Sequence, residues 1–299
     1  MALTFRIPVL EDRDIIDQHY RVGDSRSCED TFANLYLWKH LYPTEFAIEH
    51  NMLLLKSAEE DFYFRFPKGN RKKLKEAIQE MMDYSNDHGV DFKMVVVTPE
   101  QFELLEQMYP GKFEIEYDRD NADYVYEREK LANLSGKKYH GKKNHINKFM
   151  KTYPDWRYET ITDENVEECF QMALKWRNQN GCDEEEEKRT EMCVALNSLR
   201  LMKELSLRGG CLKVNDEVVA FTIGEPVNHD TFVVHIEKAF TEVDGAYTMI
   251  NQQFVQHEME DFLYVNREDD TGAEGLRQAK LSYRPVFMVE KGVVRLKDR

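Results

Sequence analysis

Three segments set the order of elements in the C-terminal half: CLKVNDEVVAFTIGE (Cys211–Glu225), TFVVHIEKA (Thr231–Ala239) and GAYTMINQQFVQHEMED (Gly245–Asp261). The first two are rich in β-branched and aromatic residues, which predicts strands. The turn residues Asn215-Asp216-Glu217 divide the first segment, so we expect a hairpin there. In the third segment, Tyr247, Ile250 and Phe254 recur at helical spacing, which predicts a helix that opens at Gly245.

The same order of elements also occurs in the N-terminal half. After the helix at 245–261, residues 262–267 predict a strand, 273–283 a helix, and 286–290 with 293–296 a closing hairpin. The N-terminal half offers strands at 46–49, 52–56 and 62–66, a helix at 71–88, a strand at 95–97, a helix from 98, and strands at 113–117 and 124–127. We therefore predict fold class α/β (α+β) with two tandem domains, residues 1–130 and 131–299, each a mixed, mostly antiparallel sheet flanked by helices.

This order is similar to the core of the GNAT acyltransferases, in which antiparallel strands precede a glycine-opened helix, a parallel strand and another helix. In such a core two neighbouring strands separate, so an acyl donor can lie between them. Free N–H groups at the start of the next helix then bind the phosphates of the donor. The sequence therefore predicts two tandem GNAT-like domains, with the chemistry in the C-terminal one.

Composition and charge exclude several classes of protein. The 299 residues are 41% hydrophobic and 32% charged, which is typical of a globular chain. No apolar run approaches the roughly 18 residues that span a bilayer, and the N-terminus lacks an apolar signal core, so we predict a cytoplasmic protein. The five cysteines form no CxxC pair, which indicates reduced, mostly buried thiols and predicts no metal site. A net charge of −15 argues against a general nucleic-acid-coating protein.

A basic block interrupts this acidic chain, because residues 131–154 contain six lysines, two histidines and no acid. Four of the lysines surround two glycines, where backbone and ammonium groups can converge on a phosphate of RNA or of a cofactor. These candidate phosphate-binding residues are Lys137, Lys138, Lys142 and Lys143. A solvated helix face is the alternative for them, and it is the interpretation that we prefer for Lys148 and Lys151.

A dense polar corner follows the strand expected at 262–267. Asn266, Arg267 and Glu268 lie at the end of that strand and are candidate substrate-binding residues. The next helix begins with two glycines, each of which costs on the order of 1 kcal/mol relative to alanine. Close approach of another backbone or of a ligand is the usual gain from such glycines.

The helix expected at 273–283 carries cations at helical spacing. Arg277, Lys280 and Arg284 fall at i, i+3 and i+7, which predicts one cationic face that could bind phosphate. As an alternative, these cations pair with the nearby acids Glu268, Asp269 and Glu274.

The strand Thr231–Ala239 holds the candidate general base. His235 and Glu237 have the same parity and therefore point to the same side of the sheet. A buried carboxylate in this position can take a proton from an attacking amine. A paired surface glutamate is the alternative interpretation of Glu237.

Three stretches resemble a known family: LSGKKYHGKKNHINKF (Leu134–Phe149), YVNREDDTGAEGLRQAKLSYRP (Tyr264–Pro285) and FANLYLW (Phe32–Trp38). They are similar to the bacterial family related to the C-terminal domain of phosphatidylglycerol lysyltransferase. The resemblance runs over nearly the whole chain, and the second stretch is the most specific. It implies a pair of GNAT-like domains and kinship with enzymes that move an aminoacyl group from aminoacyl-tRNA to a lipid or peptidoglycan amine or hydroxyl.

The chain also departs from the patterns that the resemblance implies. The lysyltransferases carry a transmembrane portion, and these 299 residues contain none. Acyl-CoA-dependent relatives hold the pyrophosphate with an RxxGxG/A-like loop, of which Gly245 and Ala246 remain here as the candidate donor loop. Glu242 and Asp244 stand where a cation is expected, and two acids would repel a pyrophosphate.

The spacing Ala279-x-x-x-Tyr283 matches the AxxxY of the fourth GNAT helix, where the tyrosine can protonate a leaving group. We therefore interpret the chain as an aminoacyl- or acyltransferase with Glu237 as base and Tyr283 as acid. The candidate donors are acyl-CoA and aminoacyl-tRNA, tRNA is the candidate macromolecular partner, and the acceptor is a small molecule or a lipid headgroup. The alternative function is a non-catalytic GNAT-like protein that binds a ligand or RNA.

Overall fold

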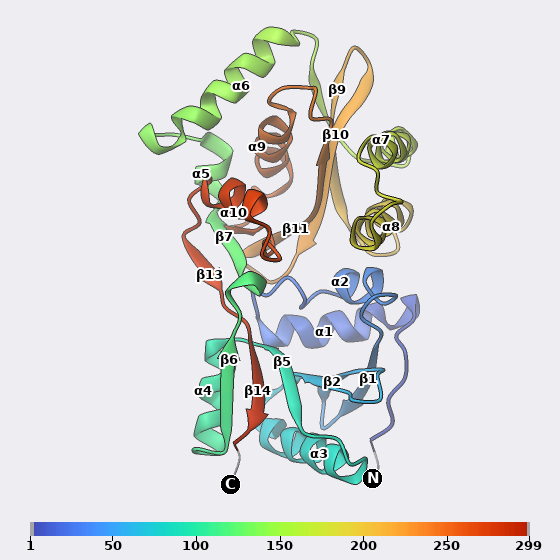
Figure 1. The fold of residues 1–299 in the computed structure, drawn as a ribbon, viewed down its shortest axis with the longest axis vertical. Helices are drawn as coiled ribbons and strands as arrows, with labels where there is room; N and C mark the ends of the chain where they lie inside the picture. The colour runs from blue at the N-terminus through green and yellow to red at the C-terminus, as the bar shows by residue number, and fades with distance from the viewer. Residues whose placement is uncertain (1–2, 298–299) are drawn as a thin grey trace. The chain divides into compact units, whose positions relative to one another are not determined.

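Two mixed β-sheets, each flanked by helices, make up the computed structural model of the chain, which describes residues 3–297 (Figure 1). The expected fold class is confirmed. The chain forms two compact units: the first comprises residues up to Tyr124, Asp269–Arg277 and the segment from Met288, and the second comprises Val125–Glu268 and Gln278–Phe287. The chain thus returns twice to the first unit, and the division at residue 130 between duplicated domains stays a prediction.

The first sheet belongs to the first unit and has the order β1-β2-β3-β5-β14-β6, with β4 paired to β2. Its strands are β1 (Thr44–Glu49), β2 (Met52–Ser57), β3 (Phe64–Arg65), β4 (Lys68–Gly69), β5 (Lys93–Val97), β6 (Phe113–Tyr117) and β14 (Gly292–Leu296). Within the described residues of this first sheet, only β3 and β5 pair in parallel, and its other strand pairs are antiparallel. The helices of this unit are α1 (Arg13–Gly23), α2 (Phe32–Leu37), α3 (Leu74–Asp87) and α4 (Pro99–Met108).

The second sheet has the order β13-β7-β12-β11-β10-β9-β8. Its strands are β7 (Asp123–Glu127), β8 (Arg157–Thr160), β9 (Arg208–Val214), β10 (Glu217–Pro226), β11 (Thr231–Ala239), β12 (Tyr264–Asn266) and β13 (Phe287–Val289). The helices α7 (Val166–Gln179) and α8 (Glu186–Arg200) lie on one side of this sheet, and α9 (Ala246–Glu258) packs on the other (Figure 1). The remaining helices are α5 (Arg128–Asn133), α6 (His140–Thr152) and α10 (Glu274–Leu281). No helix in the described part of the chain is both long and apolar enough to cross a membrane.

The closing hairpin expected from residues 286–296 is wrong. Strand β13 lies at the edge of the second sheet beside β7, whereas β14 lies inside the first sheet between β5 and β6. Gly292 permits this insertion, because a Cβ at that position would lie 2.6 Å from the side chain of Ile115. Pairing between strands so distant in sequence leaves no local signal, whereas two strand-like runs separated by a short turn have the pattern of a hairpin.

The parallel pairing of β11 with β12 is short, and this shapes the site. The two strands pair only from Thr231↔Tyr264 to Val233↔Asn266, although β11 continues to Ala239. On its other side β11 pairs with β10 from Phe232 to Ala239, with a bulge at Ile223/Gly224. The ladder between β11 and β12 therefore ends at Val233, because β12 ends at Asn266 while β11 continues.

A buried cluster of charges stabilises the first unit. The Lys291 ammonium donates to Asp123 at 2.6 Å and to Glu29 at 2.7 Å, and it lies 3.5 Å from the Cys28 sulfur. Lys291 is 3% exposed and Asp123 is fully buried. The carboxylates hold the pKa of Lys291 well above its ordinary value, although burial alone lowers it. Cys28, Glu29 and Asp123 lie close enough together to hold a metal ion, and the Lys291 ammonium supplies the positive charge among them instead.

Replacing Lys291 with methionine removes the ammonium group that bonds the buried Asp123 carboxylate. We expect Lys291→Met to lower the free energy of unfolding by about 3–5 kcal/mol, measured by urea denaturation. Adding Asp123→Asn should recover part of this loss, because the uncompensated charge is then removed. Lys297→Met, at an exposed position of the same C-terminal segment, is the matched control and should change stability little. An unchanged Lys291→Met protein would contradict the importance of this cluster.

Candidate functional site

Glu237 and Arg267 form the centre of the candidate site, which lies in the second unit. Glu237 projects from β11 and Arg267 directly follows β12, just past the last paired residues Val233 and Asn266. The Arg267 Nη2 donates to Glu237 Oε1 at 2.9 Å, and the two side chains are 12% and 13% exposed. Asn251 of α9 donates to the other oxygen, Oε2, at 3.1 Å. Side chains, rather than a backbone ladder, therefore join the two segments beyond the last paired residues.

Two tyrosine rings and a backbone contact fix the position of Arg267. Its Cζ lies 4.8 Å from the ring centroid of Tyr283 and 5.9 Å from that of Tyr126, and the two rings pack edge to face. The Lys280 ammonium donates to the Arg267 carbonyl at 2.7 Å, and the Tyr126 hydroxyl donates to the Lys280 carbonyl at 2.9 Å. Burial lowers the pKa of Arg267, but Glu237, Tyr126 and Tyr283 together raise it by more, so the net shift is upward. The guanidinium is therefore held as a rigid, permanent cation.

Lys142, from the first turn of α6, reaches the same place. Its Nζ lies 3.9 Å from the ring centroid of Tyr283. Burial, together with the nearby Arg267 charge, lowers the pKa of Lys142 to about 8, while Glu237 acts in the opposite direction. Burial also raises the pKa of Tyr283, so its hydroxyl keeps its proton at neutral pH.

Two buried polar atoms of this site have no hydrogen-bond partner among residues 3–297. They are Nη1 of Arg267, a donor, and Oδ1 of Asn251, an acceptor. Leaving such atoms unpaired costs roughly 1–3 kcal/mol each. Because both side chains bond the same Glu237 carboxylate, the spare donor and the spare acceptor belong to one small group. A ligand that offers both an acceptor and a donor would satisfy them.

His235, two residues before Glu237 on β11, lies between two carboxylates. Its Nδ1 is 2.7 Å from Glu268 Oε1 and its Nε2 is 3.0 Å from Glu225 Oε1. Burial lowers the pKa of His235, but the two hydrogen-bonded carboxylates raise it by a larger amount, so the resulting pKa is about 10. The imidazole is therefore a cation at neutral pH. The amide N–H of Glu268 donates to Asn266 Oδ1 at 2.7 Å, which fixes the polar corner.

The candidate donor loop at the start of α9 is covered by α6. Gly245 has a φ of 86°, and a Cβ there would lie 2.8 Å from the carbonyl oxygen of His145 and 3.1 Å from Phe149 Cβ. Asp244 forms an ion pair with Lys148 of α6. Lys148 and Lys151 are both exposed, as expected of a solvated helix face, and the pair with Asp244 is a surface ion pair. The glycine is required by the close approach of α6 to the start of α9.

Four of the side chains singled out from the sequence meet in this site: Glu237, Tyr283, Lys142 and Arg267. Lys137, Lys138 and Lys143 lie exposed on the turn before α6 and on α6 itself. Asn266 and Glu268 belong to the polar corner beside the site, and Lys280 supports the Arg267 backbone. Their direct roles in binding substrate stay predictions.

The expected cationic face of α10 is not formed. Arg277 donates to Asp270 at 2.8 Å and 2.9 Å and to Asp120 at 2.6 Å, and these acids are not the partners that we weighed as the alternative. The helix ends at Leu281, so Arg284 does not lie on it. Gly272 approaches Asp120, since a Cβ there would lie 2.8 Å from its carboxylate. The close approach of Asp120 therefore explains why a glycine is needed at position 272. The phosphate-binding role of Arg277 stays a prediction.

Sequence reasoning missed Asn251 and Tyr126. Asn251 is 2% exposed on the face of α9 that also buries Ile250 and Phe254. An amide within an apolar helical stripe was the available signal, because buried polar groups need partners. Tyr126 lies on β7, far from the other site residues in sequence, and no local pattern distinguishes it from a core tyrosine.

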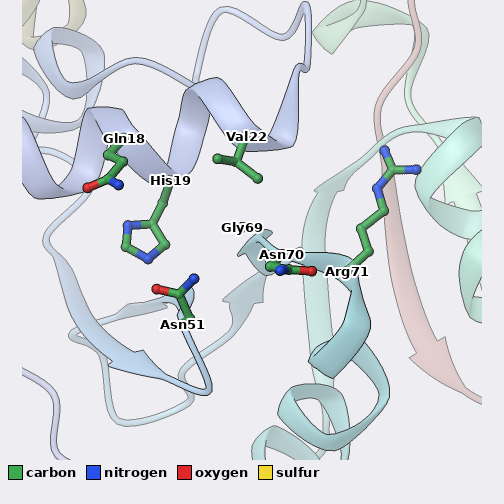
Figure 2. Close-up of a pocket in the computed structure, with 7 residues that line it drawn as sticks. All are labelled: Gln18, His19, Val22, Asn51, Gly69, Asn70 and Arg71. Atoms are coloured by element: carbon green, nitrogen blue, oxygen red, sulfur yellow. The ribbon is translucent and has the colours of Figure 1, made fainter.

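The first unit also has an open pocket, of about 300 Å³, beside α1 (Figure 2). Figure 2 shows His19 pointing from α1 toward Asn51, with Asn70 across the opening. The His19 Nδ1 lies 2.7 Å from the Ile15 carbonyl, so one ring nitrogen is already bonded within the helix. None of the side chains predicted to carry the chemistry lines this pocket, so the site in the second unit remains the better candidate.

Fold and site together define the class: a mixed α/β protein with a GNAT-like acyltransferase fold, in which a short parallel ladder between two neighbouring strands lies beside a glycine-opened helix. The family described as "Phosphatidylglycerol lysyltransferase, C-terminal" matches residues 20–294. The chain belongs to this family, which confirms the resemblance inferred from the sequence.

Several relatives share this fold. A conserved protein of unknown function from Bacteroides thetaiotaomicron is 41% identical, with a TM-score of 0.93 over 99% of this chain and 100% of that chain. The C-terminal domain of a putative lysylphosphatidylglycerol synthetase from Agrobacterium fabrum is 10% identical, with a TM-score of 0.70 over 97% of this chain and 92% of that chain. For L-PGS from Bacillus licheniformis the identity is 14% and the TM-score 0.68, over 98% and 94% of the two chains. An uncharacterised protein of Mycoplasmoides gallisepticum is 25% identical over 191 residues, and the match spans 62% of this chain and 60% of that protein.

Replacing Gly245 with alanine tests the contact between α6 and α9. The positive φ and the 2.8 Å approach to His145 predict that Gly245→Ala lowers the free energy of unfolding by about 1–3 kcal/mol. Gly141→Ala is the matched control, because a Cβ at Gly141 of α6 meets nothing within 4 Å. The control should be neutral or stabilising by up to about 1 kcal/mol. Equal stabilities of the two variants in urea would rule out the close approach.

Replacing His235 with glutamine tests the charge between Glu225 and Glu268. The variant should be less stable at pH 6 by about 3 kcal/mol, since the buried Glu225 and the partly exposed Glu268 lose the cation between them. Because the folded-state pKa of about 10 lies above the ordinary value of 6.5, the charged histidine stabilises fully below pH 6.5, and this contribution is lost as pH rises through 10. The difference between wild type and variant in urea denaturation should therefore shrink from pH 6 to pH 10. A difference that grows with pH would contradict the assignment.

Proposed function

We propose that this chain is an aminoacyltransferase that takes its acyl group from aminoacyl-tRNA and passes it to an amine or hydroxyl acceptor. Membership of the phosphatidylglycerol lysyltransferase C-terminal family supports an acyltransferase activity. The observation that carries the proposal is the buried group of Glu237, Arg267 and Asn251, with one spare donor and one spare acceptor.

The spare atoms of the site match an aminoacyl ester. Arg267 Nη1 can donate to the ester carbonyl, whose oxygen gains negative charge during attack. Asn251 Oδ1 can accept from the α-ammonium group, and the adjacent Glu237 carboxylate favours that positive charge. An acetyl group offers only the carbonyl and would leave the Asn251 acceptor unpaired. This complementarity favours aminoacyl over simple acyl transfer.

The start of α9 supports a donor other than acyl-CoA. A pyrophosphate bound in the usual GNAT manner would need the N–H groups near Gly245. The His145 carbonyl of α6 already lies against that glycine, and Asp244 beside it is an acid. A CoA pyrophosphate would therefore have to displace α6 and overcome charge repulsion.

The basic block supports RNA as the carrier. Lys137, Lys138 and Lys143 are exposed, while Lys142 from the same block reaches the candidate site. A backbone bound along the exposed lysines would thus have its end near Arg267 and Tyr283. In the proposed reaction, Tyr283 gives its proton to the ribose oxygen that leaves. Binding of this kind weakens steeply as salt rises.

A non-catalytic RNA-binding protein is the second candidate function. The exposed lysines serve RNA binding equally well without any chemistry, and the donor loop lacks the cation of the CoA-dependent relatives. The two functions differ in one respect: only the transferase requires the aminoacyl group for its tightest binding, because only that group reaches Glu237.

Thermal stabilisation by different donors separates these functions. We expect lysyl-tRNA to raise the melting temperature more than deacylated tRNA, and CoA and acetyl-CoA to have no effect. Replacing both Lys138 and Lys143 with glutamate should abolish the tRNA effect, whereas Lys175→Glu on α7, also exposed, serves as the matched charge control. A shift with CoA compounds alone would exclude the tRNA donor. Equal shifts with charged and uncharged tRNA would favour the binding protein.

A further inference from the structure

We propose that Lys142 takes the proton from the attacking acceptor, and that Glu237 is a positioning residue that holds Arg267. This inference rests on the proposed aminoacyl transfer and assigns the proton acceptor within the same site. It replaces the expectation from sequence that Lys142 is one of four equivalent phosphate ligands.

Lys142 differs in its surroundings from the other lysines of the basic block. Lys137, Lys138 and Lys143 are exposed, whereas Lys142 is half-buried with its Nζ 3.9 Å from the Tyr283 ring centroid. Within residues 3–297 its ammonium has no ion-pair partner, because Glu237 is bonded to Arg267 instead.

Three charged or titratable side chains face Lys142, and they act on its protonation in different directions. They are Arg267 from the end of β12, Glu237 from β11 and Tyr283 after α10, while Asp244, before α9, is paired with Lys148 farther along α6. Burial and the Arg267 charge lower the pKa of Lys142 to about 8 against the opposing effect of Glu237. About half of the Lys142 side chains would then be neutral at pH 8, which is the state that a general base requires.

The contacts of Glu237 make it the weaker candidate for the base. Its Oε1 accepts from Arg267 and its Oε2 accepts from Asn251, so both oxygens already bind donors. A proton placed on either oxygen would have to break or weaken one of these bonds. The carboxylate is better suited to fix the guanidinium that faces the ester carbonyl.

The proton transfers balance with Lys142 and Tyr283 acting together. The acceptor gives its proton to the lone pair on Lys142 Nζ while its nitrogen or oxygen bonds to the ester carbonyl carbon. The carbon–oxygen bond to the ribose then breaks, and the ribose oxygen takes the proton of the Tyr283 hydroxyl. A proton passed from the Lys142 ammonium to the adjacent tyrosinate restores both side chains.

The activity test uses lysyl-tRNA as donor and phosphatidylglycerol micelles as acceptor, between pH 6 and pH 9. Lys142→Arg keeps a positive charge that does not dissociate in this range. If Lys142 is the base, both the Lys142→Arg and the Lys142→Gln variant should have a transfer rate about 100-fold or more below that of the wild type. Both variants should also lose the increase in rate that the wild type shows as the pH rises through 8. Lys151→Arg and Lys151→Gln, on the exposed side of α6, are the matched controls and should retain the wild-type rate and pH profile. A Lys142→Arg enzyme with near wild-type rate would show that the positive charge is what matters, and would overturn the proposal.

A second measurement does not depend on the donor or acceptor. Labelling of the intact protein with trace acetic anhydride at a series of pH values, followed by mass spectrometry, reports the titration of each lysine. We expect Lys142 to reach half-maximal reactivity near pH 8, well below Lys151 in the same sample. An ordinary titration of Lys142 would overturn the inference even if aminoacyl transfer is found. A low midpoint without transfer activity would instead count against the proposed function and leave Lys142 as an unusually reactive amine.

Discussion

The structure of the candidate site depends on the ion pair between Glu237 and Arg267. It lies where the parallel ladder of β11 and β12 has ended, so side-chain bonds replace backbone bonds between the two segments. Burying an ion pair is costly unless the remaining hydrogen-bonding atoms are satisfied. Asn251 and the two tyrosine rings supply most of that environment, and the atoms left over are the ones that a ligand can complete.

The packing of α6 on α9 has a second consequence for function. The same helix closes the start of α9 at Gly245 and delivers Lys142 to Tyr283. The packing of one helix thus both covers the start of α9 and brings a lysine side chain into the site. The lysines of the basic block therefore differ in their surroundings: Lys142 lies in the site, and Lys137, Lys138 and Lys143 face solvent.

Much of the fold could be predicted because its elements carry local signals. The β-rich residues of Thr231–Ala239 correctly predicted strand β11, and the glycine before α9 marked the start of that helix. The closing hairpin failed because β13 and β14 pair with strands that are distant in sequence. The cationic face of α10 failed because the helix ends at Leu281 and Arg277 turns to Asp120 and Asp270, which no helical spacing can indicate.

By itself, the sequence determined the class of fold, the family and a short set of candidate side chains, since periodicity, turn residues and motif spacing are local properties of the chain. Only the tertiary structure decided which of these side chains meet. Glu237, Arg267, Tyr283 and Lys142 come from four separate segments, and the pairing of two strands and the packing of one helix bring them together. The low pKa of Lys142 likewise follows from burial beside Arg267, a property of the assembled site that no segment carries alone.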